Sequence, residues 1–189
     1  MSKKICVYTS SSTRLDKKYL ELAHSLGVAM GKSGHSLVYG AGVVGMMGEV
    51  AEGVREENGT IYGFIPERLN IKGIAYEHCT HLEITPDMYT RKKKMSDLAD
   101  AFIVLPGGFG TMDEFFDVLT LKQLGYIDKP IVILQLDGFF NGLIQQLSTM
   151  FSENFTKVSF EKYYHVAFSI DEALQYIDNY EPVGLADKW

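Results

Sequence analysis

The sequence has little cysteine, no long apolar run and a shortage of basic side chains. Its two cysteines, Cys6 and Cys79, are too few for a disulfide framework, which excludes the small secreted scaffolds that depend on one. The longest apolar runs, such as residues 131–134, are strand-sized, whereas a membrane-spanning helix needs about 20 apolar residues. The first residues lead into a strand-like run without the apolar core of a signal peptide. We therefore expect a soluble cytoplasmic protein with no membrane partner.

Acidic side chains outnumber basic ones, 24 to 18, which gives a net charge of -6. A protein that binds nucleic acid through general charge attraction needs the opposite balance, so we expect no nucleic-acid partner. The hydrophobic share of 46% and the charged share of 22% are typical of a globular protein. We expect one domain over residues 1–189, in which residues 181–189 form a loose tail.

Short runs rich in β-branched and aromatic residues alternate with segments of helical periodicity. The expected strands are residues 5–10, 36–39, 60–65, 101–105 and 131–136, with weaker candidates at 81–85 and 165–168. The expected helices are residues 16–32, 46–57, 87–99, 112–124, 139–151 and 171–180. Such alternation is typical of right-handed βαβ units. We therefore predict an α/β fold of the Rossmann-like, doubly wound type, with a mostly parallel sheet flanked by helices.

In such sheets, ligands bind beyond the carboxyl ends of the strands, so the residues after each strand are candidates for chemistry. The second expected strand is followed by a G-x-G-x-x-G spacing, Gly40-Ala41-Gly42-Val43-Val44-Gly45. This loop is suited to holding an anion, and Glu67 follows the next strand, where a ribose-binding acid lies in dinucleotide-binding proteins. Those proteins, however, carry the fingerprint on the first strand of the unit. A close helix–strand crossing explains the glycines equally well, and both interpretations stay open.

The most informative stretch follows the strand expected at 101–105 and reads Pro106-Gly107-Gly108-Phe109-Gly110-Thr111-Met112-Asp113-Glu114. Three glycines within four positions, ahead of a helix, form a backbone nest suited to a phosphate. Thr111 is placed to cap the helix and to offer its hydroxyl to the same anion. Thr111 and Glu114 also have the spacing of a capping box, which would give Glu114 a structural role. The glycine run favours a catalytic role, because a cap needs no such loop.

The third expected helix carries a charged run. Its apolar stripe passes through Met88 and Met95 at helical spacing, and Arg91 lies on this stripe. An inward-facing arginine needs an anion, because desolvating an unpaired charge is costly. We therefore predict a functional role for Arg91, and we expect Lys93 and Lys94 to form a solvated face.

These residues carry a family resemblance. The stretch from Pro106 to Glu114 resembles the PGGxGTxxE signature of the LOG family, the cytokinin riboside 5′-monophosphate phosphoribohydrolases, formerly labelled lysine decarboxylase-like. Residues 87–92 resemble the second motif of the family, and residues 40–48 resemble its glycine-rich loop. The likeness covers roughly residues 3–180.

The resemblance implies an AMP nucleosidase-like enzyme that hydrolyses the N-glycosidic bond of AMP or of its N6-prenylated forms, giving the base and ribose 5-phosphate. It implies that Arg91 and Glu114 are the catalytic pair. The residues that it places around the nucleotide are Ser11, Gly45, Lys92, Gly107, Gly108, Phe109, Gly110, Thr111, Met112, Asp113 and Thr120. It also implies a homodimer or a larger homo-oligomer, with the site close to a subunit interface.

The chain departs from the family pattern at three places. Tyr89 stands where histidine is usual, Ala41 replaces a glycine of the first loop, and residues 9–11 read Thr-Ser-Ser where Cys-Gly-Ser is common. None of these changes touches Arg91 or Glu114, so we expect any effect to fall on base preference or rate.

Cleavage of the C1′–N9 bond passes through an oxocarbenium-like sugar. Glu114, near a helix N-terminus, should be kept ionised by the helix dipole, and it would stabilise this cation or orient the attacking water. Arg91 is suited to clamp phosphate or ribose hydroxyls bidentately, which a lysine does not reproduce. This scheme needs neither a metal nor a cofactor.

Two other functions compete with this one. A lysine decarboxylase needs a Schiff-base lysine and pyridoxal phosphate, yet the run Lys92–Lys93–Lys94 lies on a helix and nothing else suggests a cofactor cradle. A non-catalytic nucleotide-binding carrier or sensor of Rossmann type would use both glycine loops without hydrolysis. Arg91 and Glu114 favour the enzyme, because a carrier has no need of an acid beside the sugar.

Overall fold

The structure is a computed structural model that describes residues 1–184. Its strands are β1 (Lys4–Tyr8), β2 (Ser36–Tyr39), β3 (Ile61–Pro66), β4 (His81–Thr85), β5 (Ala101–Val104), β6 (Ile131–Leu134) and β7 (His165–Ala167). Its α-helices are α1 (Lys17–Lys32), α2 (Gly45–Glu56), α3 (Met88–Leu98), α4 (Phe109–Gln123), α5 (Asn141–Ser152) and α6 (Ile170–Asp178). Two short 3-10 helices, η1 (Glu67–Leu69) and η2 (Val158–Tyr163), complete these elements.

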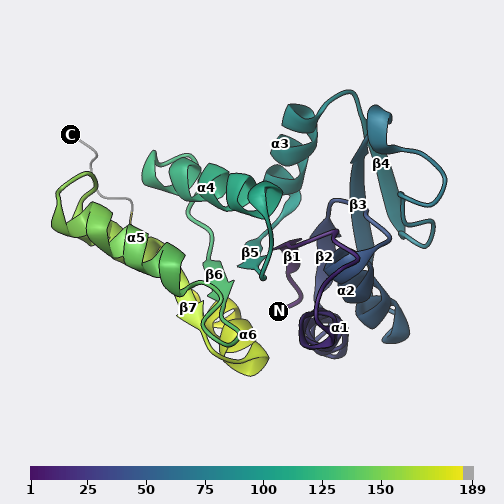
Figure 1. Cartoon of the computed structure of the whole chain (residues 1–189), viewed down its shortest axis with the longest axis horizontal. Helices are drawn as coiled ribbons and strands as arrows, with labels where there is room; N and C mark the ends of the chain where they lie inside the picture. Colours follow the sequence, from purple (N-terminus) through teal and green to yellow (C-terminus); the bar gives the residue numbers. More distant parts are fainter. Residues whose placement is uncertain (185–189) are drawn as a thin grey trace.

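The strands form one parallel sheet in the order β4-β3-β2-β1-β5-β6-β7, which confirms the predicted doubly wound α/β fold (Figure 1). The chain builds the sheet outward from β1 to β4, then crosses back to β5 and builds it outward again on the other side of β1. The strand order therefore reverses between β1 and β5. In open α/β sheets this switch point is where ligands bind, at the carboxyl ends of the strands.

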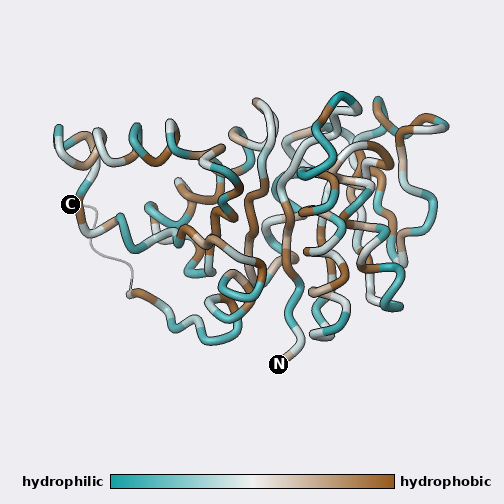
Figure 2. The backbone as a smooth tube through the Cα atoms, turned by 60° about the horizontal axis from the view of Figure 1, so that its bottom comes forward, coloured by the Kyte–Doolittle hydropathy of each residue, from teal (hydrophilic) through white to brown (hydrophobic). Residues whose placement is uncertain are grey.

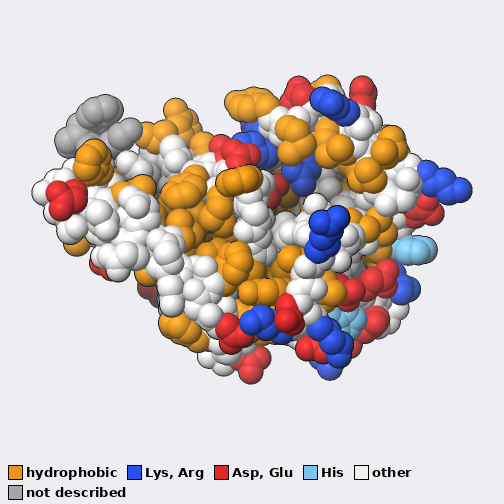
Figure 3. Space-filling view, viewed as in Figure 1, with side chains coloured by type: hydrophobic (Ala, Val, Ile, Leu, Met, Phe, Trp, Pro, Cys, Tyr) orange, Lys and Arg blue, Asp and Glu red, His pale blue; other side chains and the backbone are white. Residues whose placement is uncertain are grey.

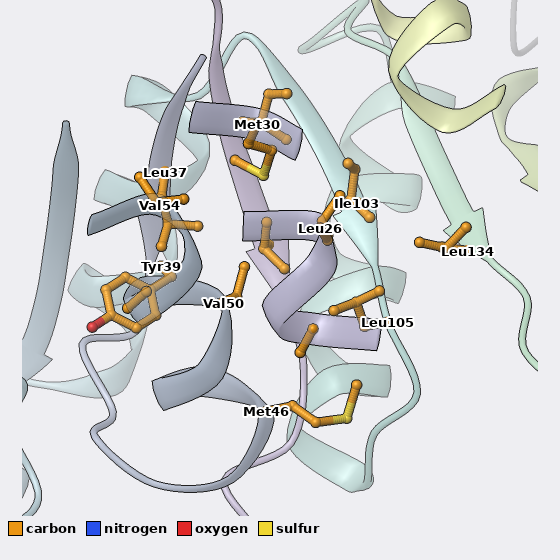
Figure 4. Close-up of a cluster of buried hydrophobic side chains, with 14 of the residues drawn as sticks. Leu26, Met30, Leu37, Tyr39, Met46, Val50, Val54, Ile103, Leu105 and Leu134 are labelled. Atoms are coloured by element: carbon orange, nitrogen blue, oxygen red, sulfur yellow. The ribbon is translucent and has the colours of Figure 1, made fainter. Parts of the chain in front are cut away.

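Helices cover both faces of the sheet, because side chains alternate along each strand. In β1, Ile5 and Val7 join the core that lies under α1, α2 and α6, whereas Cys6 and Tyr8 join the core under α3, α4 and α5. Figure 4 shows part of the first core, where side chains of α1 and α2 point toward the strands. Burial on both faces explains why the central strands are almost wholly apolar, as the hydropathy colours of Figure 2 show.

Most predicted elements are confirmed, and the main difference concerns the site. Helix α4 begins at Phe109 and not at Met112, with Gly108 as its N-cap. Thr111 therefore lies inside the first turn of α4 and is not its N-cap, so the capping box that was the alternative role for Glu114 does not form. The two 3-10 helices were not predicted.

Of the tail predicted at residues 181–189, residues 185–189 lie outside the described residues. Val183 packs against the core under α4 and α5, and its carbonyl accepts a hydrogen bond of 3.1 Å from Lys162 Nζ. Within residues 1–184, no helix has both the length and the apolar character needed to cross a membrane. In the same part of the chain, no three His, Cys, Asp or Glu side chains are grouped to hold a metal ion.

Candidate active site

A cavity of about 220 Å³ lies at the switch point of the sheet. Its walls come from the end of β1 and the loop after it, the loop after β2, the first turns of α2 and α3, and the first two turns of α4. The residues that line it are Val7, Thr9, Ser10, Ser11, Gly40, Met47, Met88, Arg91, Gly108, Gly110, Thr111, Asp113 and Glu114. This is the edge of the sheet at which the predicted fold places a ligand.

Two charged side chains of this cavity form an ion pair between α3 and α4. Arg91 Nη1 donates to Glu114 Oε1 over 3.0 Å, and the two side chains are only 9% and 11% exposed. Arg91 is thus buried, as its place on the apolar stripe predicts, and Glu114 is the anion that it finds. A charge-assisted hydrogen bond of this kind fixes both groups in one geometry.

The guanidinium of Arg91 is also held by backbone. Its Nε donates to the carbonyl of Phe64, near the end of β3, over 3.0 Å. On another side it rests against Gly40, where an added Cβ would lie 1.6 Å from Nη2. Gly40 is therefore glycine because the guanidinium occupies the space that any side chain would take.

Substituting Gly40 by alanine should displace Arg91 and impair the site. The added methyl would overlap the guanidinium, so Arg91 must give up its bonds to Phe64 and Glu114, at a cost of about 1–3 kcal/mol in stability. Chemical denaturation and any activity assay would detect the change. Gly142→Ala is the matched control, because no atom lies within 4 Å of a Cβ there; equal behaviour of the two variants would contradict this account.

Gly45 does not line the cavity, but it packs against residues that do. Its φ is +63°, and an added Cβ would lie 2.5 Å from the carbonyl oxygen of Ser12, so the residues after β1 rest directly on the start of α2. Met47 N donates to the carbonyl of Ser10 over 3.2 Å in the same contact. Gly45 thereby positions Ser10 and Ser11, which line the cavity. Both Gly40 and Gly45 are explained by close packing, while Glu67 is exposed in η1.

The start of α4 presents backbone donors to the cavity. Because Gly108 is the N-cap, the amides of the first turn have no acceptor within the helix. Gly108, Gly110 and Thr111 line the cavity, so this turn is suited to binding a phosphate or another anion. Gly107 lies behind it, where a Cβ would come within 2.1 Å of Thr111 Oγ1.

Burial and the charge of Arg91 act in opposite directions on the pKa of Glu114. Burial raises the pKa of the Glu114 carboxyl above its usual value, and the adjacent Arg91 guanidinium opposes this shift. Glu114 lies in the second turn of α4, beyond the first turn, in which the helix dipole acts. The influence that opposes the raised pKa of Glu114 is the charge of Arg91.

Known proteins resemble this chain along most of its length. The family model described as "Possible lysine decarboxylase" matches residues 47–177. The cytokinin riboside 5′-monophosphate phosphoribohydrolase LOG5 of Arabidopsis thaliana is 35% identical over 182 residues, which is 96% of this chain and 80% of that protein. LOG7 of the same plant is 36% identical over 180 residues, covering 95% of this chain and 83% of that protein.

The chain belongs to the LOG family.

Solved structures share the fold at lower identity. The molybdenum cofactor binding protein of Rippkaea orientalis has a TM-score of 0.72 and 18% identity, covering 94% of this chain and 96% of that one. The molybdenum cofactor carrier protein of Chlamydomonas reinhardtii has a TM-score of 0.71 and 20% identity, covering 94% and 97%. At these identities the likeness shows that the fold is shared, and it carries no conclusion about function.

Several residues that the LOG resemblance places around the nucleotide lie outside the cavity lining. Lys92 Nζ is paired with Asp113 at 3.0 Å, and Phe109 projects into solvent with 97% exposure. Met112 packs against the core under α4. Thr120 is exposed further along α4 and borders a separate apolar cavity beside α5 and η2. Arg91, Glu114, Ser11, Gly108, Gly110, Thr111 and Asp113 are the expected site residues that the structure brings together in this LOG-family cavity.

Other residues that line the cavity were not assigned from the sequence. Thr9 and Ser10 follow β1 directly, so the rule that ligands bind beyond strand ends already pointed to them. The sequence places Met88 only on the apolar stripe of α3, yet Met88 is 46% exposed and lines the cavity. Met47 lies within residues 40–48, but their likeness to the family's loop assigns its side chain no role, because its place depends on how closely α2 approaches the loop after β1.

Proposed function

We propose that this LOG-family protein is a phosphoribohydrolase that cleaves the N-glycosidic bond of AMP or of N6-prenylated AMP, releasing the base and ribose 5-phosphate. The observation that carries this proposal is the Arg91–Glu114 pair in one cavity with the free amides at the start of α4. The names of the Arabidopsis relatives support a nucleoside 5′-monophosphate as the substrate class.

In this proposal the first-turn amides of α4 and the Thr111 hydroxyl bind the 5′-phosphate, and Arg91 clamps the phosphate or the ribose hydroxyls. Glu114 faces C1′ and stabilises the oxocarbenium-like sugar as the C1′–N9 bond breaks. A water adds its oxygen to C1′, and one of its protons passes to the Glu114 carboxylate. The base leaves with the bonding electron pair and takes up a proton from solvent, and Glu114 then releases the proton of the attacking water to solvent. A raised pKa suits Glu114 to accept the proton of water.

The direct test is incubation of the protein with AMP and with N6-dimethylallyl-AMP, followed by chromatography for free base. Release of adenine or of the prenylated base in equal amounts with ribose 5-phosphate supports the proposal. Stoichiometric binding of intact nucleotide would instead support the carrier or sensor. The solved molybdenum cofactor binding and carrier proteins are 18% and 20% identical to this chain, a likeness that shows the fold alone, so they do not decide between the two.

The rate should fall in acid as Glu114 takes up a proton, because a neutral carboxyl neither stabilises the cation nor accepts a proton. Burial raises the pKa of Glu114, so the midpoint of this fall should lie above the ordinary value of about 4.3. The phosphate of AMP titrates near pH 6. Because this titration also affects AMP binding, kcat should be measured at saturating AMP, and the affinity for AMP should be measured over the same pH range. A midpoint at or below the ordinary value would contradict the role of Glu114.

We also propose a homodimer or a larger homo-oligomer with the cavity near the subunit interface. Phe109 and Tyr89, which adjoin lining residues in the chain, are 97% and 77% exposed. Large aromatic side chains in such positions are typical of protein interfaces. Light scattering should give a mass of at least two chains, and a fully active monomer would contradict this proposal.

A further inference from the structure

A fully buried lysine lies at the end of α4 that is remote from the cavity. Lys122, in the last turn of α4, has a side chain with no exposed surface. Its Nζ donates to the carbonyl of Lys129 over 2.8 Å and to the hydroxyl of Tyr180 over 2.7 Å. Figure 3 shows other lysine and arginine side chains at the surface, several of them beside acidic ones. Enclosing a charge, as the fold does with Lys122, is costly unless the charge is well paired.

Tyr180 links Lys122 to a carboxylate. The Tyr180 hydroxyl donates to Asp128 Oδ1 over 2.6 Å, while Lys122 Nζ itself is 3.8 Å from the same oxygen. The ammonium also faces the rings of Tyr180 and Tyr163, whose centroids are 4.7 Å and 5.9 Å away. Tyr180 therefore supplies both a hydroxyl and an aromatic ring to the surroundings of Lys122, and its departure would open them to water.

Tyr180 belongs to the segment that follows α6, residues 179–184, which we call the C-terminal strap. Tyr180 and Val183 are the strap residues that are not exposed. Val183 packs against the core under α4 and α5, and its carbonyl accepts the hydrogen bond from Lys162 of η2. A segment with so few buried apolar contacts has low local stability, so its attachment depends strongly on Tyr180.

We infer that Lys122, Tyr180 and Asp128 form a proton-linked clasp: the C-terminal strap detaches more readily while Lys122 is charged, and rising pH fastens it. Detachment returns the ammonium to water and removes the cost of its burial. A neutral amine carries no such cost and still donates hydrogen bonds to Tyr180 and Lys129. This inference is independent of the proposed function, because no ligand enters it.

The other titratable groups beside the clasp come from three elements. Burial and the bond to Asp128 raise the pKa of Tyr180, and burial raises the pKa of Tyr176 of α6, which packs edge-on against it. Both hydroxyls therefore keep their protons up to about pH 9.5. Tyr163 of η2 presents its ring. Burial also lowers the pKa of Lys129, but its ammonium is bound to carbonyls at the end of α3 and not to the strap.

The direction of the pH response follows from the two states of Lys122. In the closed clasp, burial lowers the pKa of Lys122 to about 8, and the charge of Asp128 opposes this shift only in part. In the detached form, Lys122 returns to its ordinary value of 10.5. Detachment therefore takes up a proton between these two values, so the closed form gains stability as pH rises through this window. Below the window Lys122 is charged in both forms and gives no pH dependence.

Hydrogen-exchange mass spectrometry of the full-length protein tests the clasp without a ligand. The readout is the protection factor of the amides of Asn179 and Tyr180, which donate to carbonyls of α6 and report detachment of the strap. Protection factors already correct for the pH dependence of intrinsic exchange. Amides of α1 provide the internal reference.

Two variants separate the charge from the hydrogen bonds. Lys122→Met removes the charge but keeps an unbranched side chain, and Tyr180→Phe keeps the ring but removes both hydrogen bonds of the hydroxyl. Their matched controls are Lys32→Met, at an exposed lysine of α1, and Tyr126→Phe, at an exposed tyrosine.

In the wild type, protection of the strap amides should rise about tenfold between about pH 7.5 and 9.5. In Lys122→Met it should exceed the wild-type value at neutral pH and stay constant as pH rises, because no buried charge remains. Tyr180→Phe should lower protection several-fold at neutral pH, because Lys122 and Asp128 both lose a partner. Both control variants should behave as the wild type.

Wild-type protection that changes by less than about twofold over this range would overturn the inference. So would an equal rise in Lys122→Met, because another group such as Lys129 would then be responsible. An equal rise for the amides of α1 would also overturn it, because the whole protein would then be stabilised. If Lys122→Met does not fold, Tyr180→Phe decides, and unchanged protection in that variant would show that the clasp does not hold the strap.

Discussion

Replacing Glu114 by glutamine should abolish turnover of AMP while leaving nucleotide binding intact. The amide keeps the shape of the side chain and still accepts the hydrogen bond from Arg91 Nη1, but it carries no charge to stabilise the cation. We expect a loss of at least about a thousandfold in single-turnover rate. Calorimetry with AMP should show affinity close to that of the wild type.

The matched control is Glu21→Gln, which removes a carboxylate from an exposed pair with Lys17 on α1 and should leave both rate and affinity unchanged. Loss of AMP binding in Glu114→Gln, with normal turnover of each bound complex, would contradict the assigned role. The variant should also be less stable by about 1–3 kcal/mol, because the Arg91 charge loses its counter-charge in a buried site.

Arg91→Lys should be severely impaired although it keeps the positive charge. The guanidinium donates hydrogen bonds to the Phe64 carbonyl and the Glu114 carboxylate, and it also fills the space beside Gly40. A single ammonium does not reproduce this arrangement. Displacing a clamping group by about 1 Å costs roughly a hundredfold, so we expect at least that loss in kcat/KM.

Steady-state kinetics with AMP would measure this loss. Arg55→Lys is the control, because Arg55 forms an exposed pair with Glu52 on α2, remote from the cavity lining. Near wild-type kinetics of Arg91→Lys would contradict the clamp, even if Glu114→Gln behaves as expected.

Much of the fold follows from the sequence, because the strands are continuous apolar runs and the helices between them have clear periodicity. The bounds of β2 and β4 match the prediction at both ends. The start of α4 was missed, because Gly110 has poor helix propensity and the glycine run reads as a loop.

Site residues could be predicted where a local sequence pattern marks them. Arg91 stands out because a charge on an apolar stripe needs a partner, whereas Glu114 stands out only through its glycine-rich neighbourhood. Nothing local shows that Gly40 accommodates a guanidinium from α3, or that Lys92 turns to Asp113. Both depend on how α3 lies against the sheet and α4, which is a long-range property.

Lys122 illustrates the same limit away from the site. It is fully buried and donates to the carbonyl of Lys129 and to the hydroxyl of Tyr180. Residue type alone places lysine at the surface. Only the folded arrangement of these three residues shows how its charge is satisfied.

The most direct test of the central claim is a crystal structure of Glu114→Gln with bound AMP. We predict that the phosphate lies on the amides at the start of α4 and that C1′ lies within about 4 Å of the side chain at position 114. The Arg91 guanidinium should contact the phosphoribosyl group. A complex in which both side chains point away from C1′ would contradict the account.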